Sequence, residues 1–344
     1  MTGCTPKLSD CFKIEEYMRA ISYQNTITTI PGWAPIHNDQ PRGYAYQADG
    51  YNIHVYAHND HLFIMSPGLT VTQVIGAASL DDWVAATFGA QNIVELQTPP
   101  GTVVAGVWRP GLYSESHIHQ ALSTNQFEQR SAEQALRILV EKLDEILLYI
   151  EPSPTGLGSY GHKTRELLIL ACTEIENAWS QYLRLAGSAT VRPTTNQYVR
   201  LLRPLHLADY EISYSLFQTL PVVTPFRGWR ASNPTASLPW YDAYNKTKHD
   251  RATHFNLATL ENCLHAIAAA VVMFCVRYSP FPLLNSNGPL SGLIRQHMTI
   301  RLRDPDVTSF YVPLVQLPAA YQGHLVCGRA DEFIGNWNQI PLTI

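Results

Sequence analysis

Two long stretches in which apolar residues recur every three or four positions constrain the fold of this chain most strongly. The first covers about residues 131–150 and the second about residues 162–186. Each pattern predicts an amphipathic helix, with Ser131 as the expected N-cap of the first and Gly187 ending the second. Only a short connection containing proline and glycine separates them, so we expect the two helices to pack as antiparallel neighbours.

A third apolar stretch lies at residues 257–274. We predict that one helix runs from about Trp240 to Arg277, with Pro239 near its first turn, where the missing N–H costs nothing. A bend is expected near His254. The three helices predict a bundle, which a proline-rich insertion with one strand interrupts at residues 188–238.

The N-terminal part of the chain alternates between apolar and polar residues instead. Residues 43–47 and 51–56 flank Asp49-Gly50, a pair that is typical of hairpin turns. This pattern predicts a small antiparallel β domain. Further strands are expected at residues 61–65, 91–97 and 102–109, and a short helix at residues 80–88.

At 344 residues the chain is too long for one ordinary hydrophobic core. The predicted fold class is α+β, with an antiparallel β-rich domain followed by a helical bundle and a tail. The tail is expected to add short strands, such as Met298–Leu302 and Phe310–Val312, to one of the sheets. The expected boundaries are residues 1–125 for the β-rich domain, 126–282 for the bundle with its insertion 188–238, and 283–344 for the tail.

Composition excludes several classes of protein. The net charge of -4 and the 15% of charged residues argue against a general polyanion binder, although they leave a local basic site open. The six cysteines form no Cys-x-x-Cys pair, which argues against a thiolate zinc site and a disulfide scaffold and fits the reduced cytosol. The longest apolar run is about half of what spans a bilayer, and residues 1–13 do not resemble a secretory signal. We therefore expect a cytoplasmic protein without a membrane segment.

The segment Pro239–Arg251 carries the densest polar cluster of the chain. On a helix Asn245 and His249 share one face, while Lys248 and Arg251 share another. A histidine can act as acid or base near neutral pH, and neighbouring cations can hold a phosphate. A structural interpretation is equally open, in which Asn245 and His249 hydrogen-bond buried backbone of the insertion.

The two helices followed by Tyr244-Asn245-Lys246-Thr247-Lys248-His249 resemble the HEPN superfamily (higher eukaryotes and prokaryotes nucleotide-binding) over about residues 130–280. Proteins of that family are helical bundles with an arginine, commonly followed by a polar residue such as asparagine, and then a histidine. Four to six residues separate the arginine from the histidine. Asn245 matches the asparagine and His249 the histidine, whereas Tyr244 stands at the arginine position. The segments 165–168 and 171–176 also resemble helices of such proteins. The resemblance implies a metal-independent endoribonuclease or a nucleotide-binding protein of a bacterial defence or toxin–antitoxin system, acting as a homodimer whose two motifs face one cleft.

The resemblance also implies roles for the candidate site residues. His249 would move the proton when a ribose 2′-hydroxyl attacks the adjacent phosphorus, and Asn245 would orient the histidine or the phosphate. Lys246, Lys248 or Arg251 would stabilise the charge on the phosphoryl oxygens, which is the role of the family's arginine. This chemistry requires no metal and no cofactor.

The tyrosine at the arginine position supports an alternative function. The chain would then be a catalytically inactive interaction or regulatory protein, with the bundle as a dimerisation scaffold and the β domain as the partner-recognition module. This alternative predicts that Asn245 and His249 are buried and that their polar atoms are satisfied internally.

Two histidine-rich segments are candidate metal sites, but packing explains each of them better. In the first, His54 and His58 share a strand face and His61 does not. In the second, His117 and His119 share one side of a predicted strand but lack a suitable set of carboxylates. The sequence therefore predicts no metal site.

Three further observations complete the sequence-based predictions. The chain has no P-loop, no dinucleotide-binding glycine motif and no nucleophile elbow, which disfavours those chemistries. The charged residues of the second helix are expected to be solvated or ion-paired at its edges; they are Arg165, Glu166, Glu174 and Glu176. The alternative is that Arg165 faces Asp242 or Asp250 across the bundle and positions the helix that carries His249. Aromatic side chains in adjacent strands are either a stacking surface for bases or ordinary packing; they are Tyr44, Tyr46, Tyr51 and Tyr56.

Overall fold

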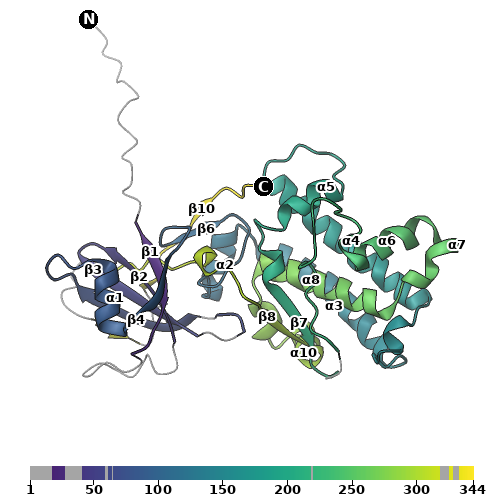
Figure 1. The fold of residues 1–344 in the computed structure, drawn as a ribbon, viewed down its shortest axis with the longest axis horizontal. Helices are drawn as coiled ribbons and strands as arrows, with labels where there is room; N and C mark the ends of the chain where they lie inside the picture. Colours follow the sequence, from purple (N-terminus) through teal and green to yellow (C-terminus); the bar gives the residue numbers. More distant parts are fainter. Residues whose placement is uncertain are drawn as a thin grey trace, which may run out of the picture. The chain divides into compact units, whose positions relative to one another are not determined.

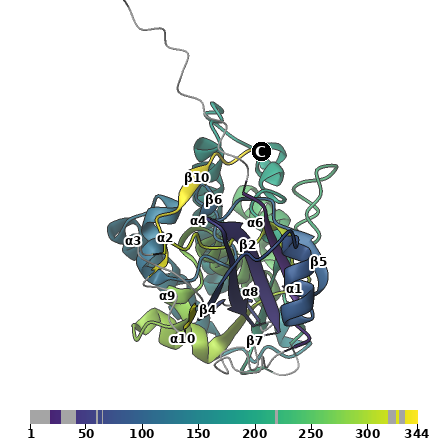
Figure 2. The same cartoon turned by 90° about the vertical axis from the view of Figure 1, so that its left-hand side faces the viewer.

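The computed structural model describes residues 18–27, 41–58, 61–63, 65–217, 220–317, 325–327 and 333–344. These residues form an α+β fold with helices and an antiparallel sheet, as predicted (Figures 1 and 2). The chain divides into two compact units. Unit 1 comprises residues 1–58, 66–101 and 307–334, and unit 2 comprises residues 59–65, 102–306 and 335–344.

This division differs from the boundaries expected at residues 125 and 283. Residues 102–125 lie with the helices of unit 2, and residues 307–334 lie with the sheet of unit 1. Strand β9 (Leu325–Cys327) pairs antiparallel with β4 (Met65–Gln73) at the edge of that sheet. The chain therefore returns to unit 1 after building unit 2, which periodicity alone does not reveal.

Unit 1 is organised by a six-stranded sheet in the order β5-β1-β2-β3-β4-β9. The remaining strands are β1 (Ala20–Gln24), β2 (Arg42–Ala48), β3 (Tyr51–Ala57) and β5 (Gln91–Glu95). Asp49 and Gly50 join β2 to β3, and both have positive φ, as a tight hairpin turn requires. The predicted hairpin is confirmed.

Helix α1 (Leu80–Phe88) covers one face of this sheet, and its predicted bounds are confirmed. Ser79 begins it with a capping box, and Gly89 ends it in the left-handed conformation at φ 58°. Buried side chains on its inner face pack against β1 and β3. His54 of β3 lies in this core, stacked on Phe88 with ring centroids 3.8 Å apart.

The buried His54 ring is engaged in packing, because its Nδ1 atom forms a hydrogen bond with the Tyr23 hydroxyl and its face stacks on Phe88. Residues 59 and 60, which join His58 to His61, lie outside the described residues. The interpretation of the strand tyrosines as a stacking surface for bases is wrong for three of the four, because their side chains are fully buried. Tyr56 lies in the core under α1, whereas Tyr44 and Tyr46 lie on the other face of β2, where the Tyr46 hydroxyl donates to the Pro313 carbonyl at 3.2 Å.

Unit 2 is a helical assembly around α8 (Leu260–Tyr278), with α3 (Gln126–Leu147), α4 (His162–Leu185) and α6 (Pro239–His249) packed against it (Figure 1). Among the described helices, α8 alone is long and apolar enough to cross a membrane. Since 78% of its apolar window is buried inside the protein, we assign it to the core of unit 2.

Local hydrogen bonds correct two predicted helix bounds. Helix α3 begins at Gln126 rather than Ser131, because the Oδ1 atom of Asn125 accepts from the backbone N–H groups of Phe127 and Glu128 at 3.0 and 2.9 Å. The helix expected from Trp240 to Arg277 is divided. It forms α6, then α7 (Arg251–His254), a 3-10 turn and α8.

Polar caps cause this division. The Asp250 side chain accepts from the Thr253 N–H at 3.1 Å and begins α7. Thr259 accepts from the Asn262 N–H at 3.2 Å and begins α8. Each cap satisfies donors that a continuous helix would bond itself, so the chain turns at both positions.

The strands and short helices of unit 2 match the predictions only in part. In the insertion, β7 (Tyr210–Tyr214) pairs antiparallel with β8 (Met298–Leu302), and both expected strands are confirmed. β6 (Thr102–Val104) is shorter than expected and pairs in parallel with β10 (Asn338–Ile340). Three elements were not predicted, namely α5 (Thr195–Tyr198), α9 (Phe281–Leu284) and α10 (Pro289–His297).

Three strand predictions are wrong. Residues 61 and 62 form a turn instead of a strand, and β4 begins only at Met65. Residues 310–312 have no strand pairing; instead, the Val312 carbonyl accepts from the Gly101 N–H at 2.8 Å. The segment with His117 and His119 is helix α2 (Glu115–Leu122), so the two rings do not share a strand face. Its buried residues Ile118, Ala121 and Leu122 follow helical spacing.

Candidate functional site

The candidate site lies at the C-terminal end of α6. Pro239 occupies the first turn of this helix, and its inner face buries aromatic and small residues against α4 and α8. The Trp240 indole N–H donates to the Pro225 carbonyl at 3.0 Å, which ties the insertion to the start of α6. The buried residues of this face are Trp240, Tyr241, Ala243, Tyr244 and Thr247.

A carboxylate of α4 organises the next turn. The Tyr241 hydroxyl donates to Glu176 Oε1 at 2.5 Å, and the Tyr244 hydroxyl donates to Glu176 Oε2 at 3.0 Å. Burial raises the pKa of both tyrosines, and the Glu176 charge raises them further. Both hydroxyls therefore keep their protons and serve as donors to the carboxylate.

Lys248 completes this chain of contacts at the surface. Its Nζ atom donates to the Tyr244 hydroxyl at 2.7 Å and lies 4.9 Å from the centroid of the same ring. The hydrogen bond to Tyr244 raises the pKa of Lys248, so the ammonium stays charged at neutral pH. An ammonium has three N–H donors, and Tyr244 uses one, so donors remain for a ligand.

The other two candidate cations are engaged differently. The Nζ atom of Lys246 lies 2.6 Å from Asp242 Oδ2, an ion pair along the exposed side of α6. The guanidinium of Arg251 lies 5.5 Å from the centroid of the Phe255 ring, beyond the end of the helix. Lys248 is therefore the candidate cation that the Glu176 network holds beside the position of the missing arginine.

His249 is exposed at the last position of α6, and Asn245 is half-buried one turn earlier. The Asn245 amide donates to the Tyr241 carbonyl at 3.1 Å. Within the described residues no hydrogen bond joins Asn245 to His249. The scaffold alternative predicts that His249 is buried, and this prediction is wrong.

Arg165 of α4 does not meet Asp242 or Asp250, and this expectation is wrong. Its Nη2 and Nε atoms donate to the Thr247 carbonyl at 3.0 and 3.3 Å. The last carbonyls of a helix have no intrahelical partner and carry partial negative charge, which attracts a guanidinium more directly than a side chain on the exposed face. Arg165 therefore fixes the end of α6 from which Lys248 and His249 project.

Sequence reasoning missed the role of Glu176. The residue was expected to be a solvated or ion-paired edge carboxylate of its helix. A signal was present, because Cys172 and Trp179 lie four residues before and three residues after it and both are buried. A carboxylate in that stripe faces the interior and requires donors there.

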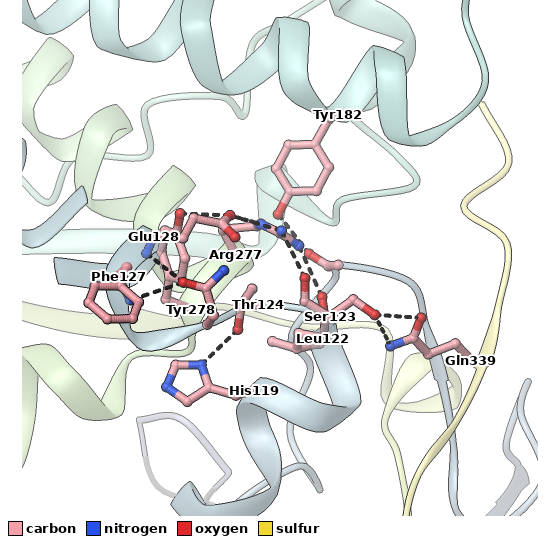
Figure 3. A network of polar contacts seen from close by, with 12 residues as sticks. His119, Leu122, Ser123, Thr124, Phe127, Glu128, Tyr182, Arg277, Tyr278 and Gln339 are labelled. Carbon is pink, nitrogen blue, oxygen red and sulfur yellow. Dashed lines mark hydrogen bonds and ion pairs between the residues drawn. The ribbon is translucent and has the colours of Figure 1, made fainter. Parts of the chain in front are cut away.

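A groove lies elsewhere in unit 2, between α3, α4 and α8. Its volume is about 300 Å3, and its floor is apolar. At one end Arg277 donates to the carbonyls of Leu122 and Ser123 and to Glu128 Oε1, which also accepts from Tyr278 (Figure 3). This network satisfies the end of α2 and the start of α3, so we interpret it as structural.

In the described parts of the chain, no group of three or more His, Cys, Asp or Glu side chains is arranged to hold a metal ion. Comparisons with protein-family models, with curated proteins and with solved structures found no match for this chain.

Proposed function

We propose that unit 2 is a HEPN-like domain that acts on RNA at the end of α6, as a metal-independent endoribonuclease of a bacterial defence or toxin system in the cytoplasm. The motif Tyr244–His249 supports the family, and the contacts around it support the activity. The protein acts as a homodimer, so that two copies of the site face one RNA strand.

One observation carries this proposal. The exposed His249 follows Lys248, whose ammonium donates to the Tyr244 hydroxyl. That hydroxyl in turn donates to the half-buried Glu176 carboxylate. A lysine that contributes only to solubility does not require a hydrogen bond that fixes its ammonium. The tyrosine at the arginine position thus becomes the anchor of the replacement cation, Lys248.

The reaction follows from these groups. His249 accepts the proton of a ribose 2′-hydroxyl as its oxygen bonds to the adjacent phosphorus. The bond between phosphorus and the 5′-oxygen breaks, and the protonated His249 of the second copy supplies the proton that this oxygen takes. Lys248 stabilises the negative charge on the phosphoryl oxygens. The products are a 2′,3′-cyclic phosphate and a 5′-hydroxyl.

Cleavage of total RNA and tRNA in the presence of EDTA tests the proposal. The wild-type chain should cut, and His249→Ala should not. His254→Ala is the matched control, because it removes a neighbouring histidine on α7 that has no role in the reaction. If the wild-type chain neither cuts nor binds RNA, the proposed function is wrong.

The size of the protein in solution is a second test. A dimer by light scattering at micromolar concentration is expected, because the reaction uses one His249 from each copy. A monomer that still cleaves RNA would contradict the shared site while leaving the role of His249 in place.

A further inference from the structure

A cluster of rings around Arg251 lies two residues beyond His249 in the sequence and has no role in the reaction above. The Tyr160 and Phe255 rings meet edge to face, with centroids 5.7 Å apart. His162, the first residue of α4, lies 5.0 Å from Phe255. Arg251 lies on the same ring at 5.5 Å and follows His249 by two residues. We call Tyr160, His162, Arg251 and Phe255 the aromatic platform.

The platform is fixed in position and open to solvent. The Tyr160 backbone forms a bridge to Thr259, and the Leu260 N–H donates to the Ser159 carbonyl at 2.9 Å. The Tyr160 ring is nevertheless 52% exposed, although these two backbone contacts hold its segment in place. A ring held in place loses little conformational freedom when a ligand stacks on it.

The charges around the platform favour an anionic ligand with flat rings. Arg251 is exposed, and His162 is exposed at the start of α4. The nearest acid in sequence, Asp250, turns its carboxylate to the Thr253 N–H as the cap of α7. Aromatic rings beside cations are the arrangement that binds unpaired bases, since every base has a face for stacking and a phosphate for the cation.

We propose that the aromatic platform stacks one unpaired base of the RNA next to the phosphate held at Lys248 and His249. The inference rests on the proposed function and adds a requirement to it. The nucleotide beside the cleaved bond must be single-stranded, because a paired base has no free face for Tyr160.

Binding measurements with short oligonucleotides test the platform. Fluorescence anisotropy is measured with a labelled single-stranded RNA, the same strand in a duplex, and the same strand with abasic positions. Tyr160→Ala should bind the single strand about tenfold more weakly than wild type does. It should lose the preference over the abasic strand, while Tyr160→Phe, which keeps the ring, should retain it.

Phe127→Ala is the matched control, because Phe127 is 82% exposed on α3 in the same unit and lies outside the platform. It should bind RNA as wild type does, and all variants should unfold at the wild-type temperature. If Tyr160→Ala binds RNA as tightly as wild type does, the platform is overturned. The same holds if Phe127→Ala weakens RNA binding as much as Tyr160→Ala does. Either result leaves the proposed function standing. If wild type binds none of the three oligonucleotides and cuts no RNA, the proposed function itself is wrong; if it cuts RNA without binding them, the platform alone is overturned.

Discussion

The support that Tyr244 gives to Lys248 can be separated from its support of the fold, because the chain offers a matched pair of tyrosines. Tyr241 and Tyr244 each donate one hydrogen bond to Glu176 from a buried ring. Only the Tyr244 hydroxyl also accepts from Lys248. Replacing each by phenylalanine therefore removes the same bond to the carboxylate and differs at Lys248.

The magnitudes follow from these contacts. A hydrogen bond to a charged group contributes about 2 kcal/mol, so Tyr241→Phe should lose about that much free energy of unfolding in urea. Tyr244→Phe also loses the bond from the exposed Lys248 and should lose at least as much. In Tyr244→Phe the Lys248 side chain also becomes free. Holding it in place again for a phosphate costs about 0.5–1.5 kcal/mol, which weakens RNA binding roughly two- to tenfold. Tyr241→Phe should bind RNA as wild type does.

The assay combines urea denaturation with anisotropy on a single-stranded RNA. Lys248→Met removes the ammonium itself and should weaken binding in the wild-type background more than in Tyr244→Phe, since the two changes act on one contact. Equal loss of RNA affinity in Tyr241→Phe and Tyr244→Phe would refute the reasoning, as would unchanged affinity in Tyr244→Phe.

Three further outcomes are expected. Arg277→Met should lower the free energy of unfolding by about 2–3 kcal/mol in urea, because the half-buried guanidinium no longer donates to Glu128 and to two helix-end carbonyls, while Tyr278 still donates to Glu128; a loss below about 1 kcal/mol would show that the network is not structural. Burial lowers the pKa of His206 from 6.5 to about 3, so the unfolded chain binds more protons between these values. Stability should therefore fall as the pH drops from about 6.5 toward 3, by on the order of 1 kcal/mol per unit, and His206→Asn, which suits the left-handed backbone at φ 50°, should show a flatter dependence in urea titrations at each pH. Ser79→Ala should destabilise unit 1 by about 1 kcal/mol through loss of the α1 capping box, and a thermal melt with no change would contradict the role of this cap.

Local patterns in the sequence predicted most of the individual elements. The β2–β3 hairpin and helix α1 follow from Asp49-Gly50 and from the apolar spacing of residues 80–88. The two long helices follow from their apolar stripes, and α4 lies within a residue of its predicted bounds. These features depend on contacts between residues close in sequence, which a single chain displays directly.

Long-range features were not predictable in the same way. The return of residues 325–327 to the sheet of unit 1 depends on pairing with a strand about 250 residues earlier, which no spacing rule encodes. The α2 segment alternates over too few residues to distinguish a strand from a helix, and its burial decides the matter. The division of the helix after His249 depends on the N-caps Asp250 and Thr259, and their capping role is evident only from their hydrogen bonds in the structure.

The candidate site shows the same contrast. The sequence placed Asn245, Lys248 and His249 together because they lie within two helical turns. It could not show which cation is held in place, because that depends on Glu176, which lies 72 positions before Lys248 on another helix. It also misplaced Arg165, whose target is a backbone carbonyl rather than a side chain.

The most direct test of the central claim is the chemistry of the RNA ends. A defined single-stranded RNA is incubated with wild-type protein and with His249→Ala in EDTA, beside the same strand carrying a 2′-deoxy sugar at the cleaved nucleotide. The account predicts a 2′,3′-cyclic phosphate and a 5′-hydroxyl from wild type, no product from His249→Ala, and no cut at the deoxy position. Cleavage that persists in His249→Ala or at the deoxy sugar would contradict it.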